Sequence, residues 1–393
     1  MPPFFTIPRQ RSLDFKPSLI PLELRAQWLH PNEAFSVLLI VGGDVIGRAL
    51  AQFSGSGIAP VTFSFGWVAY SVSALVSAFG ENRLMPQEPD YKCKVINGSS
   101  GYARENSSWI LGRMVRDFDN WCHSDTRKKT QDILETRWEG MKKKDPSVNR
   151  PVRAGLVVTI YQPSTTVAAG VVKKDWIYWS GVITMVVQLA IAAIPLGLFG
   201  DWGILMITIA GNALAIATGL LPQWKKEKWT CRRDAKDPYI LTRGNGAQHA
   251  VVVLGNKRGF NLEDLAAGRS NIEVKPGQTT QIALLILSAL WIVLLITAAG
   301  LKANTWFLLA VGGLGIVQNV FMVGLPRKPE NFGIPLEYVD VYGEAKVMQT
   351  LLAVERDYPR LGRSMREEFF PGELRPEEIQ QWEELEGRDG VAA

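Results

Sequence analysis

The chain has 393 residues, of which 47% are hydrophobic, and its formal net charge is +5. Its apolar residues are gathered in long runs, which excludes an ordinary soluble globular chain and indicates a membrane protein. The modest basic excess suits the face of an anionic lipid leaflet and gives no argument for a nucleic-acid partner.

Residues 1–34 contain no continuous apolar stretch, so they predict an N-terminal interfacial segment without a cleavable signal peptide. Crossing the hydrocarbon core takes roughly 20 apolar residues. Six runs approach that length: 35–54, 57–79, 176–199, 202–222, 280–301 and 304–326. Very short connections pair them into three antiparallel hairpins, at 35–79, 176–222 and 280–326. The sequence therefore predicts an all-α bundle of six transmembrane helices.

The basic residues predict the orientation of this bundle. Of the 43 Lys and Arg residues, 41 lie in four segments: 1–34, 80–175, 223–279 and 327–393. Positive charge accumulates on the cytoplasmic side, so both termini and both long loops are expected there, with the endoplasmic reticulum as the expected membrane. The glycosylation sequons at Asn97 and Asn106 would then stay unused, and the three cysteines would stay reduced.

The two long loops predict a small cytoplasmic α+β cap. In the first loop, residues 106–121 predict an amphipathic helix lying on the membrane surface, followed by a lysine-rich helix and a strand at 153–163. In the second, 238–259 predicts two strands joined around the turn "RGNG", and a short helix follows. We expect the strands to meet in one sheet. Residues 327–393 predict a helical tail.

The first span carries an acid and a base at helical spacing. Asp44 and Arg48 are four residues apart in "GGDVIGRALAQ", so they lie on one helix face and can neutralise each other. The pair either fixes helix packing or faces an internal cavity. Because intramembrane ionisable residues are often functional, we take Asp44 and Arg48 as the candidate catalytic residues, with Gln52 one turn further on.

Other polar and aromatic side chains within the spans are candidate substrate-binding residues. They are Gln52, Trp67, Tyr70, Gln188, Asn212, Gln318 and Asn319. The amides are more often interhelical hydrogen-bonding groups, but together they would line a chamber of mixed polarity. Aromatic faces such as Trp67 would stabilise a cationic intermediate.

The cytoplasmic segments hold two weaker signals. "TRGNGAQH" (242–249) predicts a tight hairpin turn more strongly than an anion site built from glycine N–H groups, Arg243 and His249. Asp117 and Asp119 point to different sides of a helix, which is poor geometry for gripping one metal. The sequence predicts no metal and no cofactor.

Several stretches together resemble a group of multi-pass membrane proteins from filamentous fungi. They are "GGDVIGRALAQ", "FSFGWVAYSVSALVSAFGENRLMP", "NSSWILGRMVRDFDNW", "LTRGNGAQHAVVVLG" and "FFPGELRPEE". The resemblance implies a place in fungal specialised metabolism, where membrane-bound cyclases act on terpenoid or polyketide intermediates.

Three functional hypotheses follow. The first is a membrane-embedded, cofactor-independent cyclase or isomerase that folds a lipophilic small molecule in an intramembrane cavity. The second is a non-catalytic membrane scaffold whose cytoplasmic cap recruits partners. A transporter is the third, disfavoured because no inverted repeat is visible. In each case membrane lipids are partners, and the oligomeric state is left open.

Overall fold

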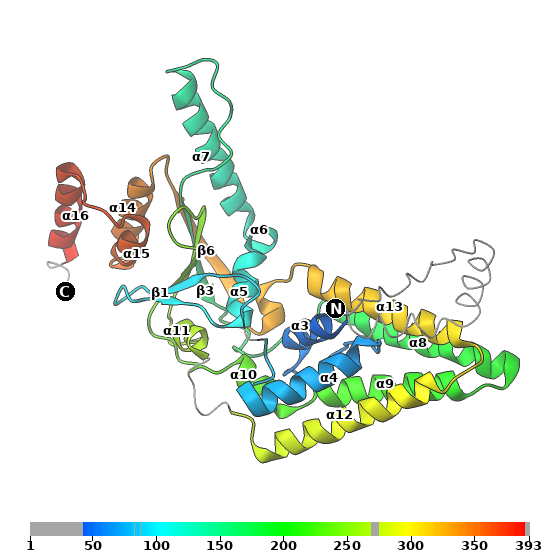
Figure 1. Cartoon of the computed structure of the whole chain (residues 1–393). Helices are drawn as coiled ribbons and strands as arrows, with labels where there is room; N and C mark the ends of the chain where they lie inside the picture. Colours follow the sequence, from blue (N-terminus) through cyan, green and yellow to red (C-terminus); the bar gives the residue numbers. More distant parts are fainter. Residues whose placement is uncertain (1–41, 82, 87, 269–274, 390–393) are drawn as a thin grey trace, which may run out of the picture.

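The computed structural model describes residues 42–81, 83–86, 88–268 and 275–389. A bundle of long helices lies beside a mixed sheet that has its own helices, here called the cap (Figure 1). The predicted N-terminal segment and residues 35–41 of the first expected span lie outside the described residues.

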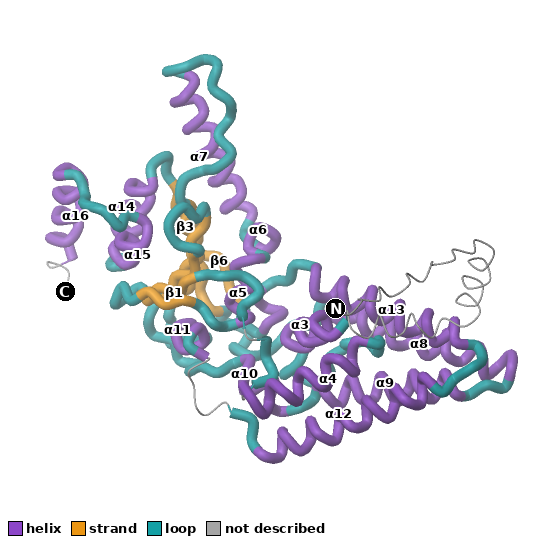
Figure 2. The backbone as a smooth tube through the Cα atoms, viewed as in Figure 1, coloured by secondary structure: helices purple, strands orange, loops and turns teal. Residues whose placement is uncertain are grey.

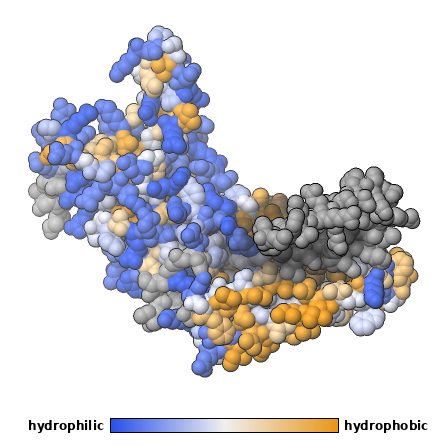
Figure 3. All heavy atoms as spheres, in the orientation of Figure 1, coloured by the Kyte–Doolittle hydropathy of each residue, from blue (hydrophilic) through white to orange (hydrophobic). Residues whose placement is uncertain are grey.

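Four long helices build most of the bundle. They are α8 (Trp176–Phe199), α9 (Gly203–Gly219), α12 (Gln278–Ala299) and α13 (Thr305–Gly324). Within the described part of the chain, α8, α12 and α13 are long and apolar enough to cross a membrane. A fourth span results if α9 and α10 (Pro222–Lys228), bent by 43° to each other, are taken as one. Many exposed side chains of α8, α9, α12 and α13 are large and apolar. The visible face of the bundle shows a broad apolar surface (Figure 3), which indicates a membrane protein.

Two hairpins have their turns at the same end of the bundle. Gly200, in the left-handed conformation, ends α8, and the Asn304 amide donates to Asp201 Oδ2 at 3.2 Å, tying the α12–α13 turn to the α8–α9 turn. The exposed Trp176 and Trp202 lie near opposite ends of α8, as expected for two interfacial belts. The long loops consequently leave from the other end, where the cap lies.

The predicted bundle of six spans is not confirmed, because residues 57–79 do not form one continuous helix. Helix α3 (Gly43–Phe53) and helix α4 (Gly66–Val76), which continues as the π-helical turn η1 (Ser77–Glu81), are joined by residues 54–65 without regular structure. Pro60 lacks an N–H, and the β-branched and aromatic residues after it have low helix propensity. Hydrophobicity alone did not distinguish such a buried extended segment from a span.

The break between α9 and α10 explains the position of Trp224. Tryptophans at span ends often lie in an interfacial belt, but Trp224 is fully buried, and its indole N–H donates to the Thr218 carbonyl at 3.0 Å. That carbonyl loses its helical partner where Pro222 begins α10. The indole of Trp224 therefore satisfies a backbone carbonyl at the end of α9, and it does not lie at the membrane surface.

The cap contains a six-stranded sheet in the order β2-β1-β4-β5-β3-β6 (Figure 2). The strands are β1 (Lys94–Asn97), β2 (Ala103–Glu105), β3 (Val157–Pro163), β4 (Tyr239–Thr242), β5 (His249–Val253) and β6 (Leu336–Gly343). The antiparallel pair β1–β4 and the parallel pair β3–β5 join the two loops, so the expected shared sheet is confirmed. Strand β6 was not expected in a helical tail. It is a partly exposed edge strand with charged residues such as Glu337 and Asp340, which hide the apolar alternation of a strand.

Helices cover both faces of the sheet. They are α5 (Trp109–Arg116), α6 (Phe118–Trp121), α7 (Ser124–Lys142), α11 (Leu262–Ala266), η4 (Pro329–Phe332), α14 (Val347–Asp357), α15 (Leu361–Phe369) and α16 (Pro376–Asp389). Leu351 and Met365 of α14 and α15 pack on one face with Val252. Trp109 and Met114 of α5 pack on the other, and α7 projects away (Figure 1).

The predicted surface helix is thus a buried one. Trp109, Ile110 and Met114 are almost completely inaccessible, and the equally buried Arg113, one turn after Trp109, donates to the carbonyls of Val323 and Leu325 at the end of α13. A cation at a helix C-terminus is favourable, so the basic face of α5 attaches the cap to the bundle.

Candidate functional site

Asp44 and Arg48 form the expected ion pair, with Arg48 Nε 2.9 Å from Asp44 Oδ2. The Asp44 side chain is 74% exposed, and Arg48 also pairs with Asp90 of the following loop, Nη1 to Oδ1, at 2.9 Å. The pair therefore belongs to the edge of the bundle, next to the cap.

Gln52 lies one turn further, but its side chain is buried. Its amide donates to the Met322 carbonyl of α13 at 3.1 Å, whereas its Oε1 has no hydrogen-bond partner. This face of α3 is packed against α13.

Asn319, Gln188 and Asn212 converge on the backbone of Thr62 and Phe63. Asn319 Nδ2 donates to the Thr62 carbonyl, and Thr62 N–H donates back to Asn319 Oδ1. Gln188 donates to the Phe63 carbonyl at 2.7 Å, and Phe63 N–H donates to Asn212 Oδ1 at 3.2 Å. Non-helical backbone at membrane depth needs such internal partners. Three of the five predicted amide side chains therefore come together around a peptide segment. Gln318 is separate, donating to Ser180 Oγ.

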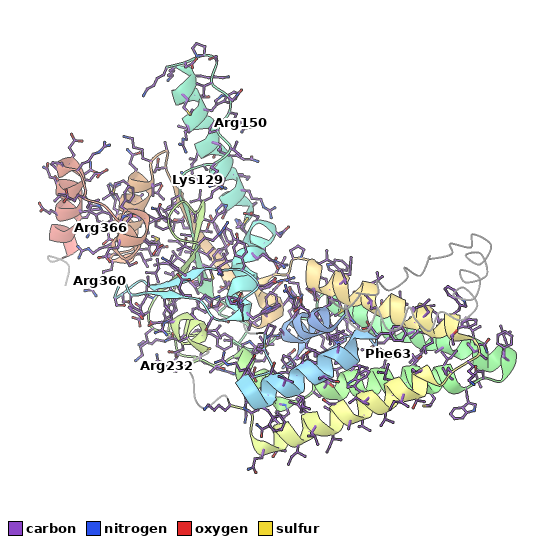
Figure 4. The ribbon with its side chains drawn as sticks, viewed as in Figure 1. Phe63, Lys129, Arg150, Arg232, Arg360 and Arg366 are labelled. Carbon is purple, nitrogen blue, oxygen red and sulfur yellow. The ribbon has the colours of Figure 1, made fainter. Side chains whose placement is uncertain are left out.

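Trp67 and Tyr70 belong to an aromatic cluster in the bundle. Trp67 stacks on Trp291 with ring centroids 5.2 Å apart, and Phe63 stacks on the same indole at 6.2 Å; Phe63 is marked in Figure 4. Trp67 Nε1 donates to the Thr62 carbonyl. Two buried polar atoms of the cluster, the Tyr70 hydroxyl and Trp291 Nε1, have no hydrogen-bond partner.

A buried charge network joins α5 to the bundle. Asp90 accepts from Arg48, Arg113 and Arg116, and the last two also pair with Asp117. The fully buried Arg113 has its pKa lowered, chiefly by burial, yet its carboxylate partners keep it charged. This network is structural, because each carboxylate is already paired.

The cysteines and the acidic residues of the described ranges form neither a disulfide nor a metal-ligand cluster. All three cysteines are free thiols, and burial raises the pKa of Cys93 and Cys231 to about 12, which makes them unreactive. Among these residues no group of three or more His, Cys, Asp or Glu is placed to hold a metal ion.

A cavity of about 440 Å³ lies in the cap at the carboxyl ends of the parallel strands β3 and β5. Its walls are mostly apolar and include Val253, Phe260, Leu262 and Ile334. Ligands of α/β proteins often bind at this end of parallel strands, an analogy that supports the location only.

Three basic side chains, Arg233, Lys257 and Arg258, also line this cavity. They are exposed, and in the described part of the chain none of them forms an ion pair. The Arg233 guanidinium lies 5.7 Å from the Phe260 ring centroid. The sequence interpretation missed this site. Its only signals were the basic run "NKRG" after a predicted strand and the Ser/Thr-rich loop "PSTTVAAG".

The cavity adjoins the connections between cap and bundle. Ala168 and Ala169 on its wall belong to the segment that leads from β3 into α8. Residues 170–172, which follow directly in the sequence, line a second cavity of about 540 Å³ together with residues 55–57 and 219–222 of the bundle. Both cavities therefore border the junction.

Comparisons with protein-family models, with curated proteins and with solved structures find no match to this chain.

Proposed function

We propose that the protein is a membrane-anchored binding protein for a lipophilic anion, held in the cap cavity of about 440 Å³. The observation that carries the proposal is the combination of apolar walls with Arg233, Lys257 and Arg258, which have no ion-pair partner in the described chain. Burial of an apolar chain contributes about 25 cal/mol per Å², and a carboxylate or phosphate forms charge-assisted hydrogen bonds with the basic groups.

The position of the cavity supports a ligand that comes from the membrane. Its wall includes Ala168 and Ala169 of the segment that leads into α8, and the next residues of the same segment line the second cavity. A molecule with an apolar tail partitions into the bilayer and reaches the junction from there. We place the cap on the cytoplasmic side of the endoplasmic reticulum membrane, in line with the basic residues of the cap segments.

Equilibrium binding to the full chain in phosphatidylcholine nanodiscs tests this function. The probes are oleate and oleyl phosphate, which share a chain and differ in the anionic group, and oleyl alcohol as the neutral analogue. We expect both anions to bind. The alcohol should have an affinity at least about tenfold lower, since it cannot form the charged contacts. The anion that binds with the higher affinity identifies the preferred headgroup.

Matched variants separate the cavity from general surface charge. Lys257→Gln with Arg258→Gln removes two charges at the cavity, and Lys144→Gln with Arg356→Gln removes two from exposed positions elsewhere. Anion binding should weaken about tenfold or more in the first pair and stay unchanged in the second. Equal affinity for oleate and oleyl alcohol, or an equal loss in both variants, would refute the proposal and favour the scaffold.

An intramembrane cyclase or isomerase of fungal specialised metabolism is the second candidate. One observation favours it: the Tyr70 hydroxyl and Trp291 Nε1 are buried without partners beside the stacked Trp67. Metabolite profiling of a deletion strain complemented with wild type, Tyr70→Phe, or Asp44→Asn with Arg48→Met tests it. A lost product and an accumulated precursor with the variants, at normal protein levels, would support an enzyme; full complementation by both would exclude these residues from catalysis.

A further inference from the structure

A second site lies at the opposite end of strand β5. Val253 at the end of this strand lines the cavity described above, whereas His249 at its beginning lines a separate pocket of about 260 Å³. The other lining residues come from the loop before β1, from α5 and α6, from the segment before β3 and from the β4–β5 turn. This pocket is independent of the lipophilic-anion site.

Positive charge dominates the pocket. Arg116, Arg153 and Arg243 line it, and Asp119 is the single carboxylate among the lining residues. Arg116 is already paired with Asp90 and Asp117. Arg153 and Arg243 are exposed and have no ion pair in the described part of the chain, so both guanidinium groups are available to an anionic ligand.

The pocket also presents an aromatic surface and a hydrogen-bonding ring. The Arg243 guanidinium lies 4.8 Å from the Tyr91 ring centroid, which fixes its plane. His249 Nε2 is 3.4 Å from Asp119 Oδ1, and its Nδ1 is buried without a hydrogen-bond partner. The ring also lies next to Gln248, whose Nε2 is 3.2 Å from His249 Nε2.

The hairpin turn explains how these groups come together. Gly244 and Gly246 adopt positive φ angles of 89° and 81°, so the chain reverses tightly between β4 and β5. Arg243 and His249 then lie on adjacent antiparallel strand ends, with Thr242 opposite Ala250. The turn predicted from "TRGNGAQH" is therefore present, and it also delivers both residues to one pocket.

We propose that this pocket binds a phosphate monoester, with Arg153 and Arg243 on the dianionic phosphate and Tyr91 beside the organic part. Guanidinium groups pair with phosphate oxygens in a bidentate geometry. The volume is below the ~300–1,000 Å³ of typical drug-sized sites, so the ligand is small, or it is a lipid headgroup whose acyl chains stay outside.

Binding of glycerol 3-phosphate to the full chain in a neutral detergent, followed by isothermal titration calorimetry, tests the site. Inorganic phosphate serves as the minimal probe, and phosphatidylcholine vesicles with and without phosphatidic acid test the lipid source. We expect saturable binding of glycerol 3-phosphate or of the phosphatidic acid vesicles. The probe that binds shows whether the phosphate monoester is a soluble molecule or a lipid headgroup.

Two variants and one control decide the outcome. Arg153→Gln with Arg243→Gln should weaken binding about 100-fold, because each lost charge-assisted contact removes about tenfold. His249→Gln should weaken it less, and Lys144→Gln with Arg356→Gln should leave it unchanged. Absence of saturable binding in both arms, or an equal loss in the control, would overturn the proposal. The lipophilic-anion site is unaffected by either result, since none of these residues lines it.

Discussion

Asn319 pairs with the backbone of Thr62 in both directions: its amide donates to the Thr62 carbonyl at 3.0 Å, and its Oδ1 accepts from the Thr62 N–H at 3.1 Å. The side chain thus takes the place of a neighbouring strand for an extended segment inside the bundle. The Thr62 hydroxyl also donates to Asn319 Oδ1. One residue of α13 therefore holds a segment that is 257 positions away in the sequence.

Replacing Asn319 by Leu should strongly destabilise the bundle. The change leaves the buried Thr62 N–H without a partner, whereas the Thr62 carbonyl keeps the Trp67 indole as a donor. A buried unmade hydrogen bond costs about 1–3 kcal/mol, so we expect a loss of about 1–3 kcal/mol. Unfolding in detergent, followed by tryptophan fluorescence, measures it. Gln318→Leu is the matched control on the same helix, since it removes a single side-chain contact with Ser180. Equal stability of the two variants would show that the Thr62 contacts contribute little.

Gly315→Ala tests the close approach of the extended segment to α13. A Cβ at Gly315 would overlap with the Phe63 carbonyl oxygen, whereas one at Gly313, two residues away, would meet nothing within 4 Å. Overpacking of this kind costs about 1–3 kcal/mol or more. We expect Gly315→Ala to lower the unfolding midpoint and Gly313→Ala to leave it unchanged or slightly raised. Tolerance of both substitutions would contradict the placement of residues 61–63.

The sequence predicted the long elements of this fold well. The expected span 176–199 coincides with α8, and the two later hairpin helices differ from their predicted limits by a few residues. These segments are uniformly apolar, and their short turns leave one possible arrangement. The β4–β5 hairpin was also predicted, because "RGNG" between β-branched residues specifies a turn directly.

The predictions that were wrong concern residues whose structure depends on tertiary contacts. Residues 57–65 belong to the apolar run 57–79, which is long enough for a span, and amides of α8, α9 and α13 satisfy the extended backbone at Thr62 and Phe63. The same amides looked like chamber-lining residues because a sequence does not show whether a buried amide faces a ligand or a peptide bond. Arg153 and Arg243 are 90 positions apart, and nothing local in the sequence brings them to one pocket.

Protonation of His249 should loosen the beginning of the interior strand β5 at low pH. Burial lowers the pKa of His249 below its ordinary value of 6.5, although the nearby Asp119 opposes the shift. A histidine with a lowered folded-state pKa stabilises the fold above pH 6.5, and this stability is lost as the pH falls towards the folded-state pKa. Arg116, Arg153 and Arg243 around the same pocket oppose protonation further.

Hydrogen exchange of β5 peptides, corrected for intrinsic rates, checks this pH dependence. Protection should fall between about pH 7 and pH 5.5, while α8 stays unchanged. His249→Gln should remove the pH dependence of β5 because glutamine does not titrate. An identical profile in the variant would mean that another group is responsible.

Glycosylation mapping tests the orientation of the cap. The sequons at Asn97 and Asn106 lie in the cap, where Asn97 donates to Glu263 and Asn106 donates to the Ser108 carbonyl. If the cap is cytoplasmic, both stay unmodified in microsomes. A flexible insertion carrying Asn-Gly-Thr between Leu301 and Lys302, in the α12–α13 turn, should be glycosylated.

The same insertion after Asp145, in the exposed loop that follows α7, supplies the control for accessibility. It is as exposed as the first insertion but belongs to the cap, so it should stay unmodified. This comparison matters because the native sequons are buried, and their lack of modification alone would not reveal the side of the membrane. Modification after Asp145 but not after Leu301 would place the cap in the lumen. In that case the positive-inside rule would not explain the basic residues of the cap segments. Their charge would instead serve to bind the anionic ligands of the cap.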